Sequence, residues 1–128
     1  MKLNTHLKID PKFSGELIDL KEHYAKVKLI TTSEMVADEE GLIHGGFTFS
    51  AADFCAMATV NHPNVVLTGA DTKFLAPIKL GDEVIFESEV LSYNEKKQEI
   101  LITAKIKEKK VFEGIFKTAI LKTHVLKL

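Results

Sequence analysis

The fold of this chain is decided by FTFSAADFCAMATV, the stretch from Phe47 to Val60. Its residues are apolar or small on every side of a helix, and a helix of that kind is a buried one. Asp53 is the only charged residue in the stretch. A carboxylate inside a buried helix costs free energy unless it is paired or takes part in chemistry. The stretch therefore predicts a buried central helix that carries one isolated acid.

The entrance to this helix is His44-Gly45-Gly46, and Asp53 follows nine residues after His44. Two glycines leave backbone N–H groups bare at the positive end of the helix dipole. At 1.5 Å per residue, the helix separates these amides from the acid by about 10 Å or more. One reacting centre must lie about 3 Å from both groups. The spacing therefore favours a homodimer in which Gly45 of one protomer meets Asp53 of its partner.

The chemistry that fits this pair of groups is attack on a polarised carbonyl. The Gly45 N–H would stabilise negative charge on the oxygen, an interaction typically worth about 3 to 4 kcal/mol of the barrier. Asp53 would act as a nucleophile or as a general base on water, and partial burial would raise its pKa. Each group also has a plainer interpretation, with Asp53 as a satisfied polar contact and His44 as an orienting or packing group.

Outside the helix, the sequence predicts strands joined by short charged tips, which makes consecutive strands antiparallel. The helix ends at Asn61 because a residue just before a proline, here Pro63, disfavours helix. One buried helix against one antiparallel sheet is an α+β fold. The predicted strands run from Leu17 to Leu20, Tyr24 to Thr31, Val65 to Leu75, Val84 to Leu91, Ile100 to Lys107 and Val111 to Leu126, with a loop from Met35 to Ile43.

The composition argues against several classes of protein. The 128 residues are expected to form a single domain spanning residues 1–128. Seventeen Lys and Arg residues against 18 Asp and Glu residues leave no basic excess, which argues against nucleic-acid binding. The N-terminal MKLNTHLKID lacks an apolar signal region, and no run is long enough to cross a bilayer. A cytoplasmic protein without a membrane partner is therefore expected.

The sequence lacks the residue patterns typical of a metal or cofactor site. Cys55 is the only cysteine, which excludes an internal disulfide and a cysteine-rich zinc site. Its place in the apolar helix predicts a small buried side chain rather than a nucleophile. The five histidines show no metal-ligand spacing, and no phosphate loop or Ser-His-Asp order is present. We therefore expect neither a metal ion nor a redox cofactor.

Three segments carry a resemblance to a known family. They are GLIHGG at residues 41–46 followed by Ala52-Asp53, KFLAPIKLGD at residues 73–82, and VFEGIF at residues 111–116. Together they resemble the hotdog-fold thioesterases, specifically the PaaI-like acyl-CoA thioesterases of phenylacetate metabolism. The resemblance covers about residues 15–121, nearly the whole chain.

The resemblance implies a long helix wrapped by a curved antiparallel sheet, and a homodimer that often pairs again into a homotetramer. It also implies hydrolysis of an acyl-coenzyme A thioester, with coenzyme A entering as part of the substrate rather than as a cofactor. In that pattern the Gly45 amide, next to His44, polarises the thioester carbonyl, and Asp53 of the partner protomer is the nucleophile or base. The expected substrate contacts are Gly46, Asp38, Phe54 and Phe74.

The chain departs from the family pattern at Asp38, where relatives often carry an asparagine that assists at the carbonyl. A carboxylate cannot donate a hydrogen bond to a carbonyl oxygen unless it is protonated. Phe54 stands where some relatives have a polar group, which suggests an apolar acyl pocket or simply a core side chain. The alternative function is therefore a non-catalytic hotdog module that binds acyl-CoA or acyl-pantetheine.

Overall fold

The computed structural model describes residues 1–128, with the predicted helix at its centre as α2, Gly45–Val60. The helix begins two residues before the predicted Phe47 and ends as predicted. Asn61 closes it with a left-handed backbone (φ 53°), and the Asn61 N–H donates to the Met57 carbonyl at 2.8 Å. Asp53 is not among the fully buried residues of the helix. Those residues are Thr48, Ala51, Ala52, Phe54, Cys55, Ala56, Met57, Ala58 and Thr59.

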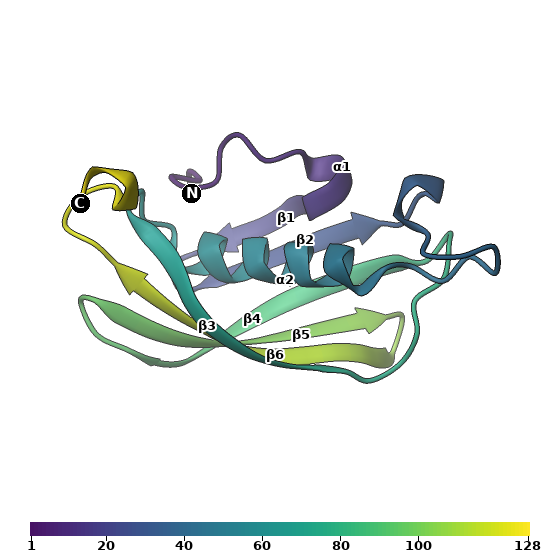
Figure 1. Cartoon of the computed structure of the whole chain (residues 1–128). Coiled ribbons are helices and arrows are strands. Elements are labelled where there is room, and N and C mark those ends of the chain that lie inside the picture. The colour runs from purple at the N-terminus through teal and green to yellow at the C-terminus, as the bar shows by residue number, and fades with distance from the viewer.

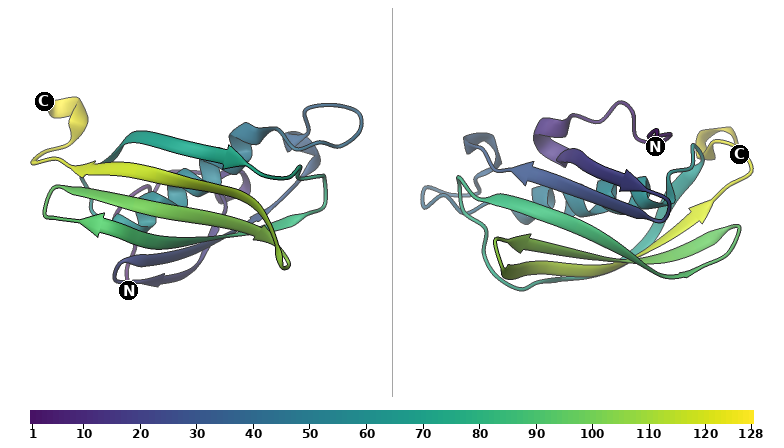
Figure 2. Two further views of the ribbon diagram at one scale, coloured as in Figure 1. Left: turned by 90° about the horizontal axis from the view of Figure 1, so that it is seen from below. Right: turned by 180° about the vertical axis from the view of Figure 1, so that it is seen from behind.

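Six antiparallel strands form one sheet that curves around one side of α2 (Figures 1 and 2). Their order across the sheet is β1-β2-β4-β5-β6-β3, so that β1 and β3 are the two edges. This architecture confirms the α+β hotdog fold that the sequence predicts. The strands are β1 (Glu16–Lys21), β2 (Tyr24–Ile30), β3 (Val65–Phe74), β4 (Glu83–Tyr93), β5 (Lys97–Ile106) and β6 (Lys109–Ile120).

The core lies between α2 and the concave face of the sheet. Alternation along the strands supplies it, since side chains of period two share one face. In β2, for example, Ala25, Val27 and Leu29 have no exposed surface. Phe86 of β4 and Phe116 of β6 are also fully buried. One face of each of these strands therefore supplies the core.

The last predicted strand is too long. β6 ends at Ile120 rather than at Leu126, and a short 3₁₀ turn, η2 (Val125–Lys127), follows. The strand stops there because its neighbours stop: Ile120 pairs with Val65, the first residue of β3. Leu126, which is 86% exposed, has no layer to pack against.

Two short elements precede α2 that the sequence pattern did not indicate. The helical turn α1 (Pro11–Ser14) begins at Asp10, whose carboxylate accepts a hydrogen bond from the Lys12 N–H at 2.9 Å. A 3₁₀ turn, η1 (Ser33–Met35), opens the loop that leads to α2. No helix of the chain combines the length and the apolar character needed to cross a bilayer.

Candidate active site

The N-terminus of α2 presents two backbone amides without partners. The N–H groups of Gly45 and Gly46 have no hydrogen-bond acceptor within the chain. His44, the N-cap residue, is tied to the preceding loop because its N–H donates to the Met35 carbonyl at 2.9 Å. The His44 imidazole makes no capping hydrogen bond. The two amides therefore point out of the helix at its positive end, where they can bind negative charge.

A side chain on either glycine would fit tightly against a neighbour at this end. A Cβ on Gly45 would lie 3.2 Å from Cε2 of Phe74, and one on Gly46 would lie 3.1 Å from Nε2 of His44. Phe74, at the end of β3, is 56% exposed and meets the edge of Phe112 with ring centroids 5.1 Å apart. The fold thus brings Phe74, from a distant part of the sequence, to the predicted site residues His44, Gly45 and Gly46.

A pocket of about 330 Å³ lies beside Gly45. The segment after β3 forms one wall, and the Ile43 N–H holds it to the loop just before α2 by donating to the Ile78 carbonyl at 2.8 Å. Most of the lining is apolar, so the pocket suits an apolar group next to the free amides. Sequence reasoning missed most of this wall, although Pro77 marks the end of the strand that leads into it. The lining residues are Leu42, Ile43, Gly45, Thr48, Phe74, Leu75, Ala76, Pro77 and Ile78.

Asp53 is partly buried, and its Oδ1 atom is enclosed without a hydrogen-bond partner. Burial raises the pKa of this carboxyl above its ordinary value, and His6 partly opposes that rise. A raised pKa suits a group that accepts a proton. Asp53 lies eight residues after Gly45 in α2, which is about 12 Å of helix. The predicted separation of the acid from the free amides within one chain is therefore confirmed.

Asp38 lies in the loop before α2, and its carboxylate folds back on that loop. Its Oδ1 accepts hydrogen bonds from the Glu40 N–H at 3.0 Å and the Leu42 N–H at 3.2 Å. The carboxylate thereby fixes the turn that delivers the chain to the helix entrance. Its expected contact with the substrate stays a prediction.

Phe54 and Cys55 lie in the hydrophobic core. Phe54 is 6% exposed, which favours its interpretation as a core side chain. Cys55 has no exposed surface, and its Sγ donates to the Ala25 carbonyl at 3.5 Å. Burial also raises the pKa of the Cys55 thiol, which keeps it protonated. The prediction of a buried, unreactive cysteine agrees with this placement.

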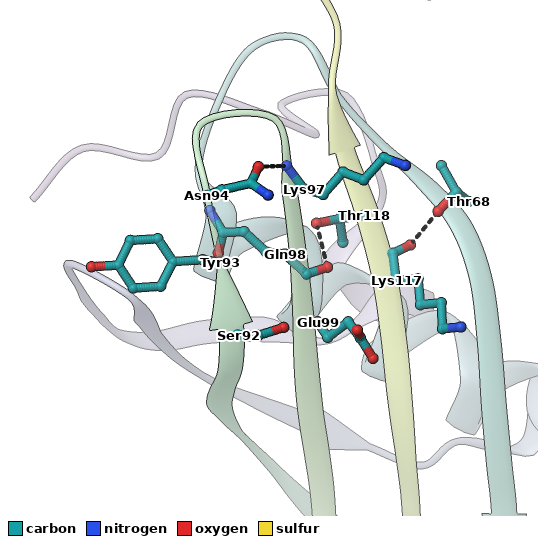
Figure 3. Close-up of a pocket in the computed structure, with 9 residues that line it drawn as sticks. All are labelled: Thr68, Ser92, Tyr93, Asn94, Lys97, Gln98, Glu99, Lys117 and Thr118. Atoms are coloured by element: carbon teal, nitrogen blue, oxygen red, sulfur yellow. Dashed lines mark hydrogen bonds between the residues drawn. The ribbon is translucent and has the colours of Figure 1, made fainter.

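A second hollow, of about 460 Å³, lies at the opposite end of the sheet near the β4–β5 turn (Figure 3). It is polar and contains none of the predicted site residues. No group of three or more His, Cys, Asp or Glu side chains is arranged to hold a metal ion. The lining residues of the hollow are Thr68, Ser92, Tyr93, Asn94, Lys97, Gln98, Glu99, Lys117 and Thr118.

Comparison with known proteins identifies relatives of this chain. Residues 40–113 match the family described as the thioesterase superfamily. A methylthioribose-1-phosphate isomerase of Aquifex aeolicus is 50% identical over 121 residues, which are 94% of this chain and 26% of that protein. The transcription factor FapR of Caldanaerobacter subterraneus is 30% identical over 114 residues, which are 88% of this chain and 57% of that protein. The chain thus spans only part of the length of these relatives.

Solved structures share the whole fold. An uncharacterized protein, PH1136 of Pyrococcus horikoshii, has a TM-score of 0.96 at 40% identity, covering 98% of this chain and 97% of that one. PaaI of Escherichia coli, from the phenylacetic acid degradation operon, has a TM-score of 0.80 at 22% identity, covering 88% and 83%. The protein smu.793 of Streptococcus mutans, solved with acetyl CoA, has a TM-score of 0.80 at 15% identity, covering 94% and 99%. The last two likenesses concern the fold alone.

Proposed function

Because this chain belongs to the thioesterase superfamily, we propose that it is an acyl-CoA thioesterase. The observation that carries the proposal is the pair of unsatisfied groups on α2. The Gly45 and Gly46 N–H groups lack acceptors, and the Asp53 Oδ1 lacks a donor although it is enclosed. An enclosed polar atom such as this oxygen normally has a partner, and the accessible amides of a helix N-terminus are free to bind one. A thioester carbonyl and a water molecule would supply the missing ones.

In this mechanism the Gly45 N–H donates to the thioester carbonyl oxygen and stabilises the negative charge that develops there. Asp53 either takes a proton from the attacking water or attacks the carbonyl carbon itself. With Asp53 as the base, water forms the new C–O bond, the C–S bond breaks, and the departing sulfur takes up the proton. With Asp53 as the nucleophile, its carboxylate forms the C–O bond as the C–S bond breaks. Water then hydrolyses the resulting mixed anhydride, which frees Asp53 and supplies the proton that the sulfur takes up. The products are a carboxylic acid and coenzyme A, and no step needs a metal ion or a redox cofactor.

The active unit in this proposal is a homodimer. The distance of about 12 Å along α2 is too long for one chain to serve one carbonyl carbon. Two copies of α2 packed around a two-fold axis bring Gly45 of one protomer to Asp53 of its partner. Each dimer then holds two equivalent sites, and a further pairing into a homotetramer is compatible with this arrangement.

The acyl group is apolar in this proposal. The pocket beside Gly45 is lined mainly by apolar side chains, with Phe74 on one side. The acidic residues Asp38, Glu39 and Glu40 precede the helix entrance and would repel a negatively charged acyl group. We therefore expect uncharged aliphatic or aromatic acyl-CoA substrates rather than dicarboxylic ones.

The decisive experiment is Asp53→Asn, assayed for thiol release over a panel of acyl-CoA substrates. We expect a loss of at least about 100-fold in kcat, the scale of losing a general base. Asp19→Asn is the matched control, since Asp19 is a partly buried aspartate on β1, outside the site. Turnover by Asp53→Asn equal to that of the unchanged protein would exclude the mechanism.

The second candidate is a module that binds acyl-CoA without hydrolysing it. It is favoured by the similarity to FapR, a transcription factor by name, and by Asp38, whose carboxylate cannot donate to a carbonyl. Binding of an acyl-CoA in calorimetry with no thiol released over the same panel would favour this module. Release of thiol that depends on Asp53 favours the enzyme.

A further inference from the structure

The pocket beside Gly45 has one polar side chain in an otherwise apolar lining. Of the residues that line it, only Thr48 carries a side chain that can donate or accept a hydrogen bond. Thr48 lies about one turn into α2 and is 2% exposed. A hydroxyl placed among apolar side chains costs free energy unless it finds a partner. The partner of this hydroxyl is therefore informative about the group that the pocket holds.

The Thr48 hydroxyl makes no hydrogen bond within the chain, unlike the other buried hydroxyls. Thr59, on the same helix, donates to the Cys55 carbonyl at 2.7 Å, and Thr118 donates to the Gln98 carbonyl at 3.1 Å. The Thr48 oxygen is not among the fully enclosed atoms that lack a partner either, so it reaches the open space of the pocket. The remaining buried hydroxyl side chains, all hydrogen-bonded, are Thr5, Thr31 and Ser88.

Thr48 and the free Gly45 amide lie close together, since both line the same pocket. Residues three apart on a helix are neighbours on one face, with about 5 to 6 Å between their Cβ positions. Helical side chains also tilt toward the helix N-terminus, so the Thr48 side chain leans back toward Gly45. In the proposed complex, the Gly45 N–H holds the thioester carbonyl oxygen. A group that is hydrogen-bonded to Thr48 then lies on the acyl chain, only a few bonds from that carbonyl.

We propose that Thr48 is a specificity-determining residue, and that the pocket selects acyl groups with an uncharged hydroxyl or keto oxygen near the thioester. This inference rests on the proposed hydrolysis and narrows its substrate class. The Thr48 hydroxyl can donate to either kind of oxygen and can also accept from a hydroxyl. A carboxylate at the same place is disfavoured by the acidic residues Asp38, Glu39 and Glu40 before the helix entrance. The rest of the acyl chain contacts the apolar lining.

The unchanged protein provides the first test, in which kcat/KM is compared for hexanoyl-CoA and three oxygenated relatives: 3-hydroxyhexanoyl-CoA, 3-oxohexanoyl-CoA and 6-hydroxyhexanoyl-CoA. We expect a substrate oxygenated at carbon 3 to be preferred about 10-fold over hexanoyl-CoA, the effect of one added hydrogen bond. Which of the two is preferred distinguishes a hydroxyl from a keto group. The 6-hydroxyl lies at the far end of the chain, so 6-hydroxyhexanoyl-CoA should gain nothing. No preference for either 3-oxygenated substrate would overturn the proposal.

The second test removes the hydroxyl and keeps the shape of the side chain, by Thr48→Val. The preference for the 3-oxygenated substrate over hexanoyl-CoA should fall about 10-fold, whereas Thr48→Ser, which keeps a hydroxyl, should retain it. Thr59→Val is the matched control, because Thr59 is a buried threonine of the same helix outside the pocket, and it should also retain the preference. If Thr48→Val lowered kcat/KM equally for both substrates, the proposal would be overturned, since the hydroxyl would then serve the fold or a group common to all acyl-CoA substrates.

Failure of this inference is distinguishable from failure of the proposed function. If Asp53→Asn keeps full turnover, the hydrolysis mechanism fails, while the preference set by Thr48 is still measured in the unchanged protein. If the unchanged protein releases no thiol, calorimetric Kd values for the same four compounds replace kcat/KM, and the 3-oxygenated compounds should bind more tightly than hexanoyl-CoA. Equal Kd values for these compounds and hexanoyl-CoA would then overturn the inference.

Discussion

Polar groups on the two sides of α2 differ in whether they have hydrogen-bond partners. Asp53 and Cys55 are two residues apart, which places them about 200° apart around the helix. On the sheet side, the Cys55 thiol donates to Ala25, and the Thr59 hydroxyl donates to the Cys55 carbonyl at 2.7 Å. On the other side, Asp53 Oδ1 has no partner within the chain. The polar groups named on the sheet side are paired within the chain, whereas the other side keeps one enclosed carboxylate oxygen unpaired.

The largest effect expected from this comparison is the loss of stability on the sheet side. Leu29→Ala removes a side chain of β2 that has no exposed surface and leaves a cavity in the core between α2 and the sheet. We expect the free energy of unfolding to fall by about 2 to 5 kcal/mol, measured by urea denaturation. Leu91→Ala is the control, because Leu91 is 47% exposed and its truncation should cost far less. Equal losses would mean that α2 is not the centre of the core.

A smaller change in stability, of opposite sign, is expected from a substitution on the Asp53 side of α2. Asp53→Asn removes a charge that burial disfavours, so the variant should be more stable at neutral pH by about 1 kcal/mol, the lower end of the cost of an unsatisfied buried polar group. The variant that loses catalysis would thus gain stability, as is common at functional sites. Thermal melting at pH 7 checks the sign, and a lower melting temperature would contradict it.

The pH dependence of this effect follows from the direction of the pKa shift. Because the folded Asp53 pKa lies above the unfolded value, the folded state retains a proton that the unfolded state has lost. The contribution of Asp53 to stability therefore decreases as the pH rises from the unfolded pKa through the folded one. Melting curves between pH 3 and 8 should show this decrease in the unchanged protein and not in Asp53→Asn. Parallel curves for the two proteins would refute it.

The smallest effect is expected for catalysis after a change on the sheet side. Cys55→Ala should leave kcat within about twofold, because the thiol is buried and protonated. A thiol reagent should react with the native protein only after denaturant is added. Rapid labelling of the native protein would show that this side of α2 opens to solvent.

The fold was largely predictable from local patterns. The apolar stretch of α2 and the alternation in β2 each follow from neighbouring residues, so their existence and type were predicted correctly. The end of β6 was not, because Val111 to Leu126 keeps an apolar content beyond the point where β3 and β5 stop pairing with it. Pairing partners, rather than propensity, end that strand.

The candidate site was predictable only in part. Gly45 and Asp53 stand out because their residue types conflict with an apolar helix, and such conflicts are visible in sequence. The wall formed by Leu75 to Ile78 was missed as part of the site, because no local pattern places this segment beside Gly45, far earlier in the chain.

The sequence by itself determined that one apolar helix with a single acid packs against an antiparallel sheet, because helix and strand patterns are set over a few neighbouring residues. Only the tertiary structure decided which groups meet at the two ends of that helix. Phe74 over Gly45 and Asn4 on Asn61 are contacts between segments far apart in the chain. Such contacts arise when the sheet and the N-terminal segment close over α2, and no local preference encodes them.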